Sequence, residues 1–108
     1  MANILILDDS IDLLDVMEII LKGNNHKAVI TSTLDSFMQK LQDNKPELIL
    51  IDVNIRNVDG RGICKQIKEK VETKNIPIIL ISASPEKLKD FKKCKADAIL
   101  DKPFNLTE

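Results

Sequence analysis

Aromatic side chains are almost missing from this chain of 108 residues, which has three Phe, no Tyr and no Trp. With so few rings it lacks the base-stacking platform that binders of single-stranded nucleic acid use. An excess of one charge is missing too, because 16 Lys and Arg against 17 Asp and Glu leave a formal net charge of −1. This balance gives no reason to expect binding to a nucleic-acid backbone or to an anionic membrane.

Long apolar runs and cysteine motifs are also missing. No run approaches the ~18 apolar residues that a membrane-spanning helix needs, and no positive segment precedes an apolar stretch at the N-terminus. We therefore expect neither a membrane span nor a secretory signal. The two cysteines, Cys64 and Cys94, form no CxxC pair and have no histidine near them in the sequence. We interpret both as reduced cysteines packed on helices, and we expect a cytoplasmic location.

What the chain does contain is a regular series of short apolar runs, each rich in branched residues. Continuous apolar runs are typical of strands that are covered on both faces, as in a parallel sheet flanked by helices. The length suits one domain, spanning residues 1–108. The runs span residues 4–7, 28–30, 48–51, 78–81 and 98–100.

Segments of helical character lie between these runs. Residues 84–86, Ser-Pro-Glu, form a good helix start, and residues 105–108 have the spacing of a capping box. The alternation predicts an α/β fold with a doubly wound, five-stranded parallel sheet, whose fifth helix is truncated at residue 108. Three of the segments carry an apolar stripe at helical spacing, and they span residues 13–21, 34–41 and 63–71.

Polar residues follow the predicted strands at one edge of the sheet. Asp8 and Asp9 follow the first strand, and Asp52 follows the third. Ser82 follows the fourth strand and Lys102 the fifth. Each alone is a common cap or turn residue. Because ligands of an open parallel sheet bind beyond the carboxyl ends of its strands, the set together predicts one functional site.

Three clustered carboxylates would repel one another strongly. Like charges ~4 Å apart repel by roughly 4 kcal/mol at an effective dielectric near 20, which is large beside a domain stability of ~5–15 kcal/mol. A divalent cation would remove the repulsion, and an oxygen-only ligand set favours Mg²⁺. With Asp8 and Asp9 holding the ion, Asp52 can serve as nucleophile in aspartyl-phosphate chemistry. Mg²⁺, Lys102 and the Ser82 hydroxyl would then balance the phosphoryl charge.

At these residues the chain resembles the receiver domains of two-component response regulators, which have a flavodoxin-like (βα)₅ fold. The resemblance runs from residue 4 to residue 108 and rests on a set of motifs in order and at similar spacing. It implies that Asp52 is the phosphoacceptor, and that the backbone carbonyl of Asn54 is a further protein ligand of Mg²⁺. The motifs are Asp8-Asp9, Asp52, Asp59-Gly60, Ser82 and Lys102-Pro103-Phe104.

The resemblance implies signalling rather than turnover of a substrate. Such domains catalyse their own phosphorylation and their own dephosphorylation. The phosphoryl group comes from a histidine kinase, a phosphotransfer protein or a small phosphodonor. Phosphorylation shifts a pre-existing equilibrium and alters the surface around the fourth helix and fifth strand that an output partner reads.

Three positions depart from the family pattern. Arg56 stands where the family often has Pro in the loop after the phosphoacceptor, and Lys95 replaces the Gly that commonly precedes the fifth strand. Ile99 replaces the usual Tyr or Phe. Because an aliphatic side chain stiff at χ1 cannot swing inward as the ring does, we expect output to run mainly through the loop after Ser82 and the Lys-rich segment 85–94.

Other interpretations are weaker. A phosphatase of the haloacid dehalogenase class would need an Asp-x-Asp pattern that Asp8-Asp9-Ser10 lacks, and a substrate cap for which the chain has no room. A flavin-binding protein would need a phosphate loop after the first strand. A degenerate receiver that only binds a partner stays open until phosphorylation is measured.

His26 is predicted to be a surface residue at the edge of the sheet opposite the acidic residues. The lysines from Lys87 to Lys95 are predicted to form either a solvated face or a docking face for an acidic partner.

Overall fold

The computed structural model describes residues 2–56, 58–82, 89 and 91–101. Within them, five strands form one parallel sheet in the order β2-β1-β3-β6-β7. The flavodoxin-like, doubly wound fold expected from the sequence is confirmed, and all five apolar runs are strands of this sheet. The strands are β1 (Asn3–Leu7), β2 (Lys27–Thr31), β3 (Leu48–Asp52), β6 (Ile78–Ser82) and β7 (Ala98–Asp101).

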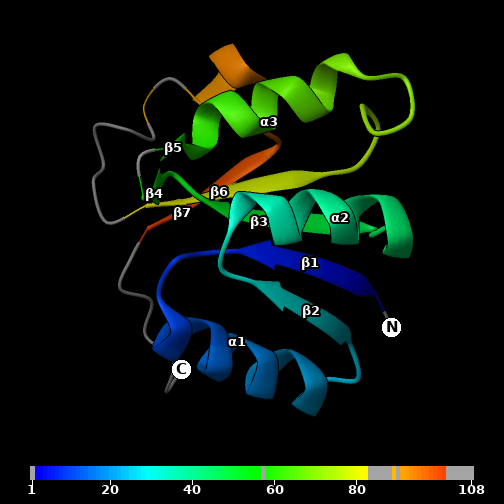
Figure 1. Cartoon of the computed structure of the whole chain (residues 1–108), viewed down its shortest axis with the longest axis vertical. Coiled ribbons are helices and arrows are strands. Elements are labelled where there is room, and N and C mark those ends of the chain that lie inside the picture. Colours follow the sequence, from blue (N-terminus) through cyan, green and yellow to red (C-terminus); the bar gives the residue numbers. More distant parts are fainter. Residues whose placement is uncertain (1, 57, 83–88, 90, 102–108) are drawn as a thin grey trace.

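Helices cover both faces of the sheet (Figure 1). Helix α1 (Ile11–Gly23) lies on one face, while α2 (Leu34–Asn44) and α3 (Gly60–Glu69) lie on the other. Successive residues of a strand point to opposite faces, so β1 buries Ile4 and Ile6 in the α1 layer and Leu5 and Leu7 in the α2 and α3 layer. This two-sided burial explains why the strands are apolar at consecutive positions. None of the described helices is long and apolar enough to cross a membrane.

Helix α3 ends earlier than the apolar stripe in the sequence predicts. The α3 helix ends at Glu69, so the predicted extension of its stripe to Val71 is wrong, and Val71 is 77% exposed. Lys70 takes extended backbone angles, and the Thr73 hydroxyl donates to the Ile67 carbonyl at 2.6 Å, which satisfies an acceptor of the last helical turn.

The region of the predicted fourth helix is only partly described. Its described part contains a 3₁₀ helix, η1 (Phe91–Cys94). The helix start predicted at residues 84–86, Lys87, and the capping box predicted at residues 105–108 lie outside the described residues. Lys95, directly after η1, has a φ of 65°. The Gly that the family often has here would adopt this left-handed backbone without the steric cost that a side chain brings.

The two cysteines meet across the fold, which their separation in the sequence does not suggest. Both are buried and reduced, as predicted. Cys64 lies in α3, and its Sγ donates to the Cys94 carbonyl oxygen at 3.4 Å. Burial, and then the neighbouring Cys94, raise the pKa of the Cys64 thiol to about 12. Thiolate chemistry at Cys64 is therefore disfavoured at neutral pH, and the pair serves to pack η1 against α3.

His26 lies at the start of β2, at the edge opposite the acidic residues, as predicted. It is partly rather than fully exposed, and its Nδ1 accepts the Ala2 N–H at 3.0 Å. This contact gives the imidazole a structural role at the beginning of the sheet.

A buried lysine ties α3 to the starts of β6 and β7. The Lys68 side chain is 8% exposed and forms an ion pair with Asp97 at 2.7 Å. It also donates to the Ile76 carbonyl at 2.7 Å, while Asp97 accepts the Ile78 N–H at 2.8 Å. Burial opposes ionisation of Asp97, but the hydrogen bonds from Lys68 and Ile78 and the charge of Lys68 outweigh it and hold its pKa below its usual range.

We expect Asp97→Asn to lower the free energy of unfolding at neutral pH by about 1 kcal/mol, a modest figure because Asp97 is half exposed and solvent screens the pair. A lowered folded-state pKa stabilises the fold above the unfolded pKa of about 3.9, and the effect is lost as the pH falls through the folded pKa. Urea unfolding at pH 7 and pH 3 measures this. The difference between wild type and variant should shrink at the lower pH, and a difference equal at both would contradict the assignment. Glu18→Gln, in a helical pair with the exposed Lys22, is the control and should change little.

Candidate functional site

Parallel strands deliver three predicted site residues to one edge of the sheet. Asp52 ends β3 and Ser82 ends β6, while Asp8 directly follows β1. Because Leu7 pairs with Ile51 in the register of β1 and β3, Asp8 and Asp52 are the next residues on neighbouring strands. The predicted convergence of Asp8, Asp9, Asp52 and Ser82 at the carboxyl edge therefore follows directly from the topology.

The three carboxylates form one cluster. Asp8, Asp9 and Asp52 each offer a carboxylate oxygen, and these oxygens lie within 4.8 Å of one another. Asp8 is 0% exposed and Asp52 is 3% exposed, while Asp9 is partly exposed. Buried carboxylates without a metal or a cation are costly, so burial distinguishes this cluster from the acidic groups common on surfaces. Ser82 is also fully buried.

Backbone groups hold the two buried carboxylates in place. The Ser10 N–H donates to Asp8 Oδ1 at 2.9 Å, and the Ser10 hydroxyl in turn caps α1 by accepting the Leu13 N–H. The Asn54 N–H donates to Asp52 Oδ1 at 3.1 Å. Both are side-chain turns that reach two residues forward, which Asp forms readily. Each carboxylate is oriented by the loop that immediately follows its own strand.

The loop after Asp52 contains a short hairpin that the sequence did not predict. It pairs β4 (Asn54–Ile55) with β5 (Val58–Asp59). The Asp59 side chain caps α3 by accepting the Arg61 N–H at 2.9 Å and also forms an ion pair with the Arg61 guanidinium. Asp59 is therefore engaged at the helix start.

Gly60, the first residue of α3, lies against the backbone of the phosphoacceptor candidate. Its N–H donates to the Val53 carbonyl at 2.8 Å. A Cβ added at Gly60 would lie 2.2 Å from the Asp52 carbonyl oxygen and 2.9 Å from Ile51 Cγ2. Only glycine allows this close approach, which gives a physical reason for the Asp59-Gly60 motif.

The structure describes one of the two remaining predicted site residues, Asn54, but not the other, Lys102. Asn54 is exposed and its backbone N–H donates to Asp52 Oδ1, while the role of its carbonyl as a metal ligand stays a prediction. Lys102, with Pro103 and Phe104, lies outside the described residues.

Thr31 was missed by sequence reasoning. It ends β2, its hydroxyl donates to the Ile6 carbonyl at 2.6 Å, and its own carbonyl accepts the Asp8 N–H at 3.1 Å.

The arrangement can hold a metal ion. Three carboxylates with no His or Cys among them are the donors that hard, oxygen-binding cations take. Two are buried and pre-oriented by backbone N–H groups, which favours a compact site. These residues therefore fit a divalent cation.

We expect Asp9→Asn to stabilise the metal-free protein and to weaken its stabilisation by Mg²⁺. Removing one of three mutually repelling charges should raise the free energy of unfolding in a chelator by about 1–2 kcal/mol, while the rise in melting temperature on adding Mg²⁺ should shrink because a ligand is lost. Melting curves with chelator and with Mg²⁺ measure both effects. Asp15→Asn, at an exposed carboxylate within α1, controls for net charge. A variant no more stable than wild type in chelator would show that the carboxylates do not repel.

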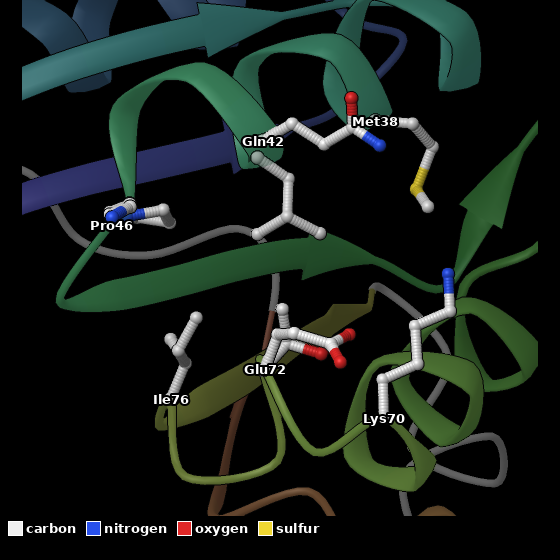
Figure 2. A pocket seen from close by; sticks show the side chains of 9 residues that line it. Met38, Gln42, Pro46, Lys70, Glu72 and Ile76 are labelled. Atoms are coloured by element: carbon white, nitrogen blue, oxygen red, sulfur yellow. The ribbon is translucent and has the colours of Figure 1, made fainter.

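The surface has hollows both at the acidic edge of the sheet and away from it. One of about 430 Å³ is lined by Asp9 and by the hairpin after Asp52. A larger pocket of about 630 Å³ lies at the opposite edge, between α2 and the chain after α3 (Figure 2). Pro46 and Ile76, which line it, precede β3 and β6 rather than follow them. The larger pocket is thus remote from the carboxylates and is not part of this site.

Comparison with known proteins agrees with the fold and the acidic site. The family model described as the response regulator receiver domain matches residues 4–108. The response regulator ArlR of Staphylococcus epidermidis is 31% identical over 110 residues, which cover 100% of this chain and 49% of ArlR. The alkaline phosphatase synthesis transcriptional regulatory protein PhoP of Bacillus subtilis is 26% identical over 108 residues, covering 98% of this chain and 44% of PhoP.

Solved structures lead to the same family. The chemotaxis protein CheY4 of Vibrio cholerae superimposes with a TM-score of 0.88 at 28% identity, covering 97% of this chain and 89% of that chain. The chain spans about half the length of the curated relatives it matches. With the parallel sheet, the acidic cluster at its carboxyl edge and a match over residues 4–108, the chain belongs to the response regulator receiver domain family, a family of signalling domains rather than classical enzymes.

Proposed function

We propose that this chain is the phosphoacceptor switch of a two-component system, phosphorylated on Asp52 by the phosphohistidine of a histidine kinase or a phosphotransfer protein. The observation that carries the proposal is the cluster of Asp8, Asp9 and Asp52 oxygens within 4.8 Å of one another, with two of the residues buried. The same proposal includes a cytoplasmic location, a single domain over residues 1–108, and an output partner or domain.

The proposed chemistry assigns different work to the three carboxylates. Asp8 and Asp9 would hold Mg²⁺, together with Asp52 and the backbone carbonyl of Asn54. When bound, Mg²⁺ supplies positive charge that offsets the carboxylates and the phosphoryl group. The hydrogen bond from the Asn54 N–H to Asp52 Oδ1 fixes the orientation of the carboxylate that acts as the nucleophile. One O–P bond forms as the P–N bond of the phosphohistidine breaks, and the imidazole leaves with the electron pair.

The proposed switch begins at Ser82. Its position at the end of β6, beside β3, suits a hydroxyl that donates to a phosphoryl oxygen on Asp52. Lys102 would pair with the same group by family analogy. Ile99 in β7 is 41% exposed and is aliphatic, so we assign output to movement of the loop after Ser82 and the segment 85–94 rather than to a swinging ring.

Phosphorylation in solution tests the proposal. With Mg²⁺ and acetyl phosphate or phosphoramidate, the intact mass should rise by one phosphoryl group, and that group should be released by base and by hydroxylamine, as acyl phosphates are. A chelator should prevent the gain. A protein that binds Mg²⁺ yet gains no phosphoryl group from either donor would instead be a degenerate receiver.

A further inference from the structure

Arg56 lies at the mouth of the acidic site. It follows β4, in the turn of the hairpin after Asp52, and its side chain is exposed. It lines the hollow of about 430 Å³ described above and a second of about 350 Å³ beside α2. Asp9, the carboxylate of the cluster that is open to solvent, lines both hollows as well. A cation therefore borders the two hollows through which an incoming molecule reaches Asp9.

The guanidinium of Arg56 is available to a ligand. The chain has two arginines, and Arg61 is occupied by Asp59, with contacts of 2.6 Å to 3.1 Å between its guanidinium and that carboxylate. Arg56 makes no hydrogen bond or ion pair within the part of the chain that the structure describes. Its five N–H donors form a planar fork that matches the oxygens of a phosphate or carboxylate.

An anionic phosphodonor must approach three carboxylates. With Mg²⁺ bound, the three carboxylates keep a net charge of −1, and a positive group at the entrance offsets this remaining repulsion. Acetyl phosphate is mainly a dianion at neutral pH and carries both a phosphate and an acyl oxygen, whereas phosphoramidate carries a single net negative charge. The benefit from one cation should therefore be larger for the dianion.

We propose that Arg56 is a positioning residue that binds the anionic group of small acyl-phosphate donors at the mouth of the site and thereby selects for them. This rests on the proposed function, because it concerns the donor of the same reaction. In the transfer, the O–P bond to Asp52 forms while the bond from phosphorus to the acyl oxygen breaks. The carboxylate of the donor leaves with the electron pair, and no proton or further reactant is needed.

The test compares the rate of phosphorylation of Arg56→Gln and wild type with each donor. With acetyl phosphate we expect a loss of about fivefold, the effect of removing one screened charge a few ångströms from a dianion. With phosphoramidate the loss should be under about twofold. Arg56→Lys should restore part of the rate, because it keeps the charge and loses the fork. At high salt the acetyl phosphate rates of wild type and Arg56→Gln should converge, since exposed charges are screened.

Lys70→Gln is the matched control, because Lys70 is an exposed cation lining the pocket at the opposite edge (Figure 2). It should leave both rates unchanged. Equal losses for the two donors, or the same loss in Lys70→Gln, would overturn the role of Arg56. If Arg56→Gln folds poorly, Arg56→Lys decides, since its acetyl phosphate rate should lie below that of wild type while its phosphoramidate rate should stay nearly the same. The proposed function fails in a different way, namely if wild type is phosphorylated by neither donor.

Discussion

Asp52→Asn should gain no phosphoryl group from acetyl phosphate or phosphoramidate, where wild type gains one. An amide oxygen keeps the size of the carboxylate and can still accept the Asn54 N–H, so the loop should stay in place. It lacks the negative charge that makes a carboxylate a nucleophile, so the rate should fall to background. Intact mass measured over time in Mg²⁺ gives the result.

Asp59→Asn is the control for this substitution. Asp59 lines the same hollow as Asp9 but lies outside the cluster of three carboxylates. Because Asn also caps helices well, the start of α3 should survive, and this variant should still gain one phosphoryl group. Stoichiometric labelling of Asp52→Asn at another residue would show that Asp52 is not the acceptor.

The strands and the acidic site were predictable from sequence because both follow from one physical pattern. A strand buried on both faces must be apolar at consecutive positions, so Leu5 and Ile6 reveal both the strand and its two covered faces. Once such strands are parallel, whatever follows them meets at one edge. The placement of Asp8 beside Asp52 needed no knowledge of side-chain contacts.

Sequence reasoning missed three features, each for a different physical reason. The β4–β5 hairpin consists of two-residue strands, too short for any periodicity to show. Val71 continues the helical spacing, yet Thr73 binds the Ile67 carbonyl and the helix has already ended. The contact of Cys64 with Cys94 spans 30 residues and arises because η1 packs on α3.

Gly60→Ala should be among the most damaging single changes to this fold, although it adds one methyl group. The new Cβ would lie 2.2 Å from the Asp52 carbonyl oxygen, a backbone atom that cannot rotate away as a side chain can. Either α3 moves outward or the end of β3 shifts, and overpacking of this kind costs about 3 kcal/mol. Because the atom displaced belongs to Asp52, phosphorylation should slow even in molecules that remain folded.

Gly62→Ala supplies the comparison, since Gly62 lies two residues further along the same helix. A Cβ there meets nothing within 4 Å, and alanine in place of glycine stabilises a helix by roughly 0.5–1 kcal/mol. Urea unfolding of both variants should therefore give shifts of opposite sign. If Gly60→Ala were as stable as wild type, the close approach of α3 to the Asp52 backbone would not be a constraint on the site. Stability shifts of opposite sign would show that Gly60 is required for its close contact with the phosphoacceptor strand. Helix formation would not explain such a result, because glycine is unfavourable for the helix at both positions.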